Sequence, residues 1–216
     1  NKSKFSRFLD FKFSNDFYSP HIPGYLEIQN ICRIIIGENK RIDLQEKQWE
    51  IKELKEQEIL ELLQHKIIQS DTTQNWSNLL NHFLTDKKNI VGLNISGQKI
   101  PPLEIISNSR YDLFNAKTLI INIEEDTSVN ISQINLGDQN SALSISTYFN
   151  IGKDSVVNHG VISFGKKKSH IINTLNVWQH KNSEYNLGSL QFEYDFGRLE
   201  ISVNQVEGNA KTNIKG

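Results

Sequence analysis

The sequence predicts a mainly β protein with a smaller, mostly helical N-terminal region, and the boundary lies near residue 89. After Lys88, apolar and polar residues alternate in segments of about six to nine residues. No helical period separates these segments, and turn residues interrupt them about every 11 to 17 residues. The predicted turns are 124–127, 137–138, 152–153, 165–166, 181–183, 197 and 208–209. This pattern fits a sandwich, a barrel or a stacked solenoid, and periodicity leaves all three open.

Residues 1–88 predict an N-terminal region with a short strand and two helices. Ile34–Ile36, followed by Gly37, predicts a short buried strand. From about Leu54, apolar residues recur at helical spacing with glutamates between them, which predicts an amphipathic helix with a solvated acidic face. A second helix is expected after the capping cluster at 70–73. Its apolar stripe consists of Trp76, Leu79, Leu80, Phe83 and Leu84.

Residues 89–216 predict the β core. The clearest alternating segments are Leu119/Ile121/Ile123, Val129/Ile131, Leu143/Ile145, Leu190/Phe192/Tyr194/Phe196 and Leu199/Ile201/Val203. Because residues two apart in a strand point to the same face, we expect Leu190 to Phe196 to share the inward side of one strand. Phe192 is then buried, and Glu193 is exposed.

Composition excludes several classes of function. The 216 residues are 37% hydrophobic and 23% charged, which is typical of a globular protein. The 24 Lys and Arg balance 25 Asp and Glu in a net charge of -1, so a nucleic-acid binder is not expected. A signal peptide is not expected from the first residues of this sequence, and no apolar run reaches membrane-spanning length. With a single Cys32, a reducing, cytosol-like compartment fits best.

Several motifs suggest chemistry but favour simpler interpretations. Gly160–Lys167 matches G-x4-G-K, yet Lys167 stands where a phosphate-binding loop needs Ser or Thr, so a basic β-turn is expected. Cys32 adjoins an apolar run and is interpreted as a buried, inert thiol. Glu124–Asp126 is interpreted as a solvated turn rather than a cation site.

Three histidines lie in successive strand-like segments of the β core. His159, His170 and His180 could converge on a metal ion if their strands were adjacent. No second Cys and no regularly placed carboxylate completes a ligand set, so we expect strand-end or packed histidines. We assign no catalytic, cofactor-binding or metal-binding residues.

An enzyme that cleaves polysaccharides on a β-solenoid is the alternative from another class. Such chemistry needs carboxylates and Arg at one point on neighbouring strands. After residue 89 the only arginines are Arg110 and Arg198. Interaction or scaffolding is therefore favoured.

Four stretches resemble the SufD family, the iron–sulfur cluster assembly subunits of the SufB/SufD superfamily, and especially its cyanobacterial and plastid forms. Phe196–Gly216 is similar to a strand pair of that family, and Thr118–Gly137 to one of its strands. Asn75–His82 and Pro101–Glu104 resemble the entry into its β-helix. The resemblance covers about residues 30–216 through order and spacing.

The resemblance implies a right-handed parallel β-helix, incomplete at the C-terminus, after a mostly helical N-terminal region. It implies a non-catalytic scaffold subunit of the SufBCD complex, with SufB and the ATPase SufC as partners. Neither nucleic acid nor membrane is implied, and the location is the cytoplasm or the plastid stroma. No cofactor is expected in this chain, and an iron–sulfur cluster is expected only at the interface of the complex. The family's SufC-contacting helices would lie beyond Gly216, so the 216 residues alone are expected to self-associate and not to capture SufC.

Overall fold

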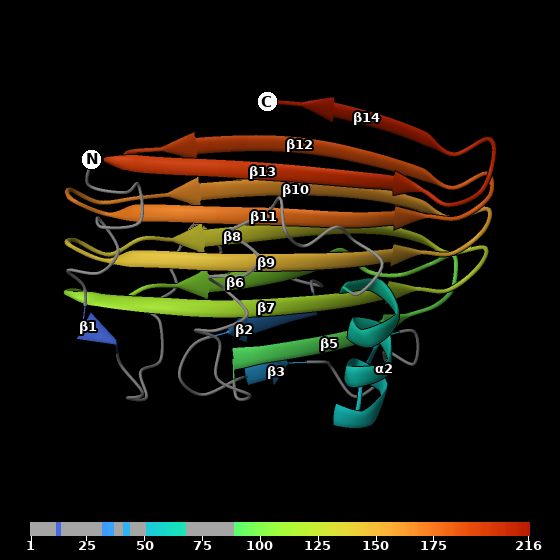
Figure 1. Cartoon of the computed structure of the whole chain (residues 1–216), viewed down its shortest axis with the longest axis horizontal. Coiled ribbons are helices and arrows are strands. Elements are labelled where there is room, and N and C mark those ends of the chain that lie inside the picture. The colour runs from blue at the N-terminus through green and yellow to red at the C-terminus, as the bar shows by residue number, and fades with distance from the viewer. Residues whose placement is uncertain (1–11, 14–31, 37–40, 44–50, 68–88) are drawn as a thin grey trace.

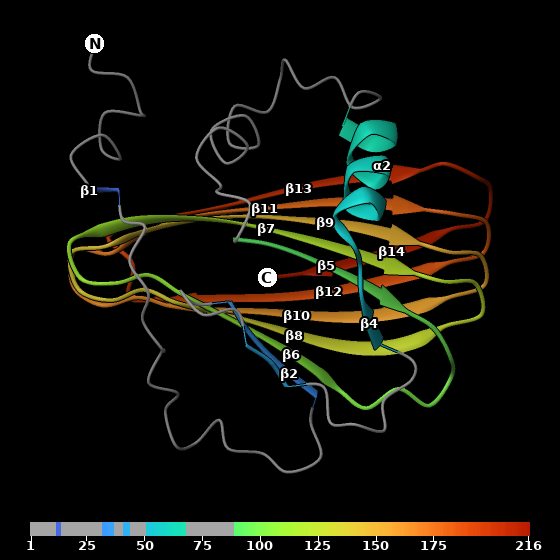
Figure 2. The same ribbon diagram turned by 90° about the horizontal axis from the view of Figure 1, so that it is seen from below.

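Two parallel sheets wind together into a right-handed β-helix in the computed structural model of the chain, which describes residues 12–13, 32–36, 41–43, 51–67 and 89–216 (Figure 1). From residue 90 onward, successive strands alternate between the two sheets, which face each other (Figure 2). The fold is therefore a stacked solenoid, and the expected parallel β-helix is confirmed.

Among the described residues, each sheet contains seven strands. Sheet A consists of β1 (Lys12–Phe13), β4 (Ile51–Glu53), β5 (Ile90–Ile95), β7 (Leu113–Ile123), β9 (Ala142–Ile151), β11 (His170–Gln179) and β13 (Phe196–Gln205). Sheet B consists of β2 (Cys32–Ile36), β3 (Arg41–Asp43), β6 (Leu103–Asn108), β8 (Ser128–Leu136), β10 (Val156–Phe164), β12 (Glu184–Phe192) and β14 (Lys211–Lys215). Helix α2 (Glu56–Ile67) lies outside sheet A (Figure 2).

The coil length is set by a turn chemistry that repeats twice per coil. Val156 pairs with Ser128 on one side and with Glu184 on the other, so these coils take 28 residues each. Every 14 residues, one turn residue adopts a positive φ between 53° and 61°. These residues are Asp112, Asp126, Asn140, Asp154, Lys168 and Asn182. Asn and Asp tolerate this left-handed conformation better than most residues, so most of these turns form with little strain.

A buried hydroxyl follows five of these turn residues. The five are Thr127, Ser141, Ser155, Ser169 and Ser183. Ser155 Oγ donates to the carbonyl of Glu124 in the preceding coil at 2.7 Å and accepts from the amide of Thr127 at 3.0 Å. Since buried backbone groups need partners, these hydroxyls hold one turn on the next.

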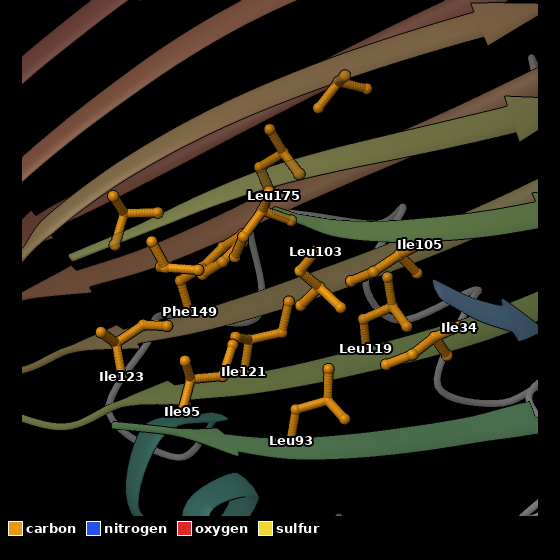
Figure 3. Packing of buried hydrophobic residues seen from close by; sticks show 14 of the residues in the cluster. Ile34, Leu93, Ile95, Leu103, Ile105, Leu119, Ile121, Ile123, Phe149 and Leu175 are labelled. Carbon is orange, nitrogen blue, oxygen red and sulfur yellow. The ribbon is translucent and has the colours of Figure 1, made fainter. Parts of the chain in front are cut away.

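The core fills the space between the sheets with aliphatic and aromatic side chains. Leu119, Ile121, Phe149 and Leu175 are at most 1% exposed and belong to one continuous cluster (Figure 3). Complete burial of each such side chain contributes about 1.5–3 kcal/mol to folding. Ladder hydrogen bonds and this cluster together fix the inward face of each strand.

The N-terminal strands add to the same two sheets. The short strand expected at Ile34–Ile36 is confirmed as β2, which pairs in parallel with β6 through Cys32 and Leu103. β4 pairs antiparallel with β5. The first helix is confirmed as α2, whereas the second predicted helix lies outside the described residues. The division of the chain into 1–88 and 89–216 stays a prediction.

The expectation for Leu190 to Phe196 was wrong. β12 ends at Phe192, and β13 begins at Phe196, with Glu193 at φ 57° between them. Leu190 is 57% and Phe192 43% exposed, because pairing of Tyr185 with Val157 turns the other alternate set inward. The turn expected at Gly197 is likewise absent, since this residue lies within β13.

Candidate functional site

A cleft of about 620 Å³ beside α2 is a candidate site. Its walls come from β4, α2 and the ends of β5 and β7. Four carboxylates and two ammonium groups line it: Glu53, Glu58, Glu61, Glu124, Lys52 and Lys55. The acidic excess favours a cationic group over an anion.

Three of the cleft carboxylates already have structural partners, of which Glu61 Oε1 accepts from Gln57 Nε2 within α2 at 3.2 Å. Glu58 Oε2 accepts from the backbone amide of Lys55 at 2.7 Å and so caps the first turn of α2. Glu124 Oε1 accepts from Asn94 Nδ2 at 2.6 Å. Within the described ranges, no three His, Cys, Asp or Glu side chains come together as a metal site. The cleft therefore offers charge rather than a ligand set.

Helix α2 lies on an apolar patch of the outer face of sheet A. Ile120, Tyr148 and Trp178 form this patch, and Leu54, Ile59 and Leu62 pack against it. The rings of Tyr148 and Trp178 stack 6.2 Å apart. Gly92 permits the close approach, because a Cβ there would lie 2.6 Å from Ile59 Cγ1.

The three histidines occupy different environments. His159 points into the β-helix, where its Nδ1 lies 2.8 Å from the Tyr185 hydroxyl, and burial lowers its pKa to about 3. His170 begins β11, and its ring lies 6.3 Å from that of Phe196. His180 lies at a turn beside Asn150. The structure thus does not bring them together.

The sequence analysis did not predict a group of buried polar side chains inside the β-helix. Lys117 is 3% exposed, and its Nζ donates to the carbonyls of Asn108, at 2.9 Å, and Ile36. On the opposite sheet, Asn135 Nδ2 donates to Ser163 Oγ at 3.1 Å. The sequence feature that could have indicated it is Lys117, which occupies the same alternate position as the inward residues Leu119 and Ile121.

The outer face of sheet B carries an exposed apolar patch, which we define as Ile162, Phe164, Leu190 and Phe192. Ile162 pairs with Leu190, and Phe164 pairs with Phe192 in adjacent strands. The two phenyl rings stack 5.2 Å apart. Apolar side chains on an exposed sheet face are typical of interaction surfaces.

The other motifs considered in the sequence adopt the structural roles expected of them, as strand, turn or buried residue. Gly160 to Phe164 belongs to β10, and Lys166 in the following turn forms an ion pair of 2.9 Å with Asp138. Cys32 is buried, and Glu124 to Asp126 forms an exposed turn. Arg198 pairs with Glu200 of its own strand.

Comparison with protein families decides among the possible β-solenoids. Residues 105–216 match the family model described as SUF system FeS cluster assembly, SufBD core domain. The chain belongs to the SufBD core-domain family. The matched range covers more than half of the chain and runs from within β6 to the end of β14, so the regular coils are the SufBD core. The superfamily resemblance is thereby confirmed.

Neither the curated proteins nor the solved structures gave a match to this SufBD-core chain. In the described ranges, no helix combines the length and the apolar character needed to span a membrane.

Proposed function

We propose that this chain is a non-catalytic scaffold subunit of the SufBCD iron–sulfur cluster assembly complex, of the SufD type. The observation that carries the proposal is the match of residues 105–216 to the SufBD core domain. The resemblance of Phe196–Gly216 and Thr118–Gly137 to SufD of cyanobacteria and plastids supports the narrower assignment. The iron–sulfur cluster is cargo in this role and is not a resident cofactor.

The geometry supports a role in which surfaces matter more than an enclosed pocket. The cleft beside α2 is open and acidic, and three of its carboxylates have partners within the fold itself. The apolar patch on sheet B lies on β10 and β12, each of which pairs with a strand on both sides. Such a preorganised surface loses less conformational freedom on binding. A protein with these features is suited to hold partners in a fixed arrangement.

The partners proposed are homologues of SufB and of the ATPase SufC, in the cytoplasm or the plastid stroma. A near-neutral charge balance supports protein partners over nucleic acid. SufC contacts are proposed to lie outside residues 1–216, as the family resemblance implies. SufB is therefore the partner proposed for the β-helix itself.

Affinity purification of the natural full-length protein from its own cells tests this function. We expect a SufB homologue and a SufC-type ATPase to copurify in constant ratio through size-exclusion chromatography. An unrelated β-solenoid protein with the same tag is the control. A preparation that lacks both partners and cleaves polysaccharides would overturn the proposal in favour of the carbohydrate-active alternative.

A further inference from the structure

One chain of side-chain hydrogen bonds runs along the stack of coils at the turn that leads from sheet A to sheet B. Its members are Glu124, Asn94, Asn122, Asn150, His180 and Glu207. Asn94 Nδ2 donates to Glu124 Oε1, Asn122 Nδ2 to Asn94 Oδ1, and Asn150 Nδ2 to Asn122 Oδ1, each at 2.6 Å. His180 Nε2 then lies 3.2 Å from Asn150 Oδ1.

The direction of this chain is fixed at the Glu124 end. An ionised carboxylate only accepts hydrogen bonds, so Asn94 must present its amide nitrogen to Glu124. The oxygen of Asn94 then faces Asn122, and the same orientation passes through Asn122 to Asn150. The oxygen of Asn150 therefore faces His180. Because that oxygen can only accept, Nε2 of His180 must carry a proton.

The opposite end of the chain places a second requirement on the same ring. His180 Nδ1 lies 3.5 Å from Glu207 Oε1, and this carboxylate also only accepts. Nδ1 therefore bonds to Glu207 only when it carries a proton as well. A neutral imidazole has one N–H, whereas the imidazolium ion has two. Only protonated His180 satisfies both neighbours.

We propose that His180 is a protonation-dependent clamp, which joins the coil containing Glu207 to the preceding coils through an oriented Asn ladder that begins at Glu124.

The charges around His180 fit a clamp that responds to pH. Lys181 is its neighbour in the chain, and Lys153 lies in the turn of the preceding coil, 4.0 Å from Glu125. Desolvation raises the pKa of Glu207, but the hydrogen bond with His180 and the charge of Lys153 outweigh it, so the net pKa is lowered. The lowered pKa favours the ionised form of Glu207, which accepts a hydrogen bond and cannot donate one. Loss of the proton from His180 removes one of its two hydrogen bonds.

Nitrogen-15 NMR of the imidazole rings tests the clamp in the intact chain. The shifts of Nδ1 and Nε2 report the fraction of His180 that carries both protons. We expect this fraction at pH 7 to fall about two- to five-fold in Glu207→Gln, given the energies usual for exposed pairs. Glu124→Gln is the decisive variant. Its amide can donate to Asn94, which lets the ladder reverse and offer a donor to neutral His180.

The outcomes separate the clamp from an ordinary ion pair. A similar fall in Glu124→Gln, far from His180 in the sequence, supports the oriented ladder. A fall in Glu207→Gln alone indicates a local ion pair and overturns the proposal, and so does an unchanged fraction in both variants. His170 in the same spectra is the internal control, and circular dichroism verifies that each variant is folded. Failure here leaves the proposed scaffold function untouched.

Discussion

The outer faces of the two sheets differ in what covers them. On sheet A, helix α2 packs over Ile120, Tyr148 and Trp178, and Trp178 is 6% exposed. On sheet B, Phe192 occupies an outward position of comparable character and is 43% exposed. Both faces belong to one solenoid with one coil geometry. The comparison shows that the residues between the sheets stabilise the stack of coils. An outer face can therefore either pack against a helix of the same chain or remain exposed to solvent.

The largest effect expected from this difference is in Trp178→Ala compared with Phe192→Ala. Removal of the buried indole should cost about 3–5 kcal/mol, because a cavity remains under α2. Phe192 keeps much of its surface in water, so its loss should cost about 1 kcal/mol. Urea unfolding of both variants measures the two values. Equal costs would show that the two faces are equivalently covered in solution.

A substitution at Gly92 probes how α2 is seated on sheet A. A Cβ at this position would lie 2.6 Å from Ile59 and 2.9 Å from Leu54, so Gly92→Ala should displace the helix at a cost of about 1–3 kcal/mol. Hydrogen exchange should accelerate in residues 56–67 and stay unchanged in β9 and β11. Gly188→Ala is the matched control on sheet B, since a Cβ there meets no atom within 4 Å. Similar exchange in both variants would contradict the close contact.

The interior of the β-helix gives an effect that is graded with pH, at most about 1.4 kcal/mol for each pH unit, through His159. Its folded pKa of about 3 lies below the ordinary value of 6.5, so the unfolded chain binds the proton more strongly. Stability from the neutral imidazole is complete above pH 6.5 and falls as pH decreases toward 3, by at most about 1.4 kcal/mol per pH unit. Unfolding at pH 6.5, 5.5 and 4.5 measures this slope. His159→Gln should flatten it, and an identical slope in the variant would place the titration elsewhere.

The alternation of apolar and polar residues predicted a strand correctly where the segment itself also showed which alternate set of residues faces inward. Leu119, Ile121 and Ile123 outnumber Ile120, the one apolar residue of the opposite set between Thr118 and Ile123, and all three are buried in β7. Near Phe192, both alternate sets contain apolar residues, so the segment itself does not reveal which set faces inward. The partner strand decides, and Tyr185 opposite Val157 sets the phase. The register of a strand is determined by its neighbours in the stack, so the sequence of one segment does not predict it.

The site features depended even more on long-range geometry. The carboxylates Glu53 and Glu124 are far apart in sequence and meet at one cleft only because β4 adds to the edge of sheet A. The Asn ladder could not be recognised in the sequence either. Its residues are one coil apart, and the sequence alone did not predict the length of a coil. Lys117 could have been noticed at an inward position, but its carbonyl partners come from two other segments.

Because the turns repeat at a constant spacing, the β-helix could be shortened or lengthened by one whole coil without a change in the register of the remaining strands. Phe114 lies opposite Ala142, and Ala142 lies opposite His170, each at the same place in the coil. Excision of residues 142–169 would bring His170 opposite Phe114 and leave each inward position facing inward. A single deleted residue within a strand would instead turn the rest of that strand inside out. Removal of a whole coil therefore preserves the inward phase of every strand, whereas we expect deletions of one residue to be tolerated only in the turns.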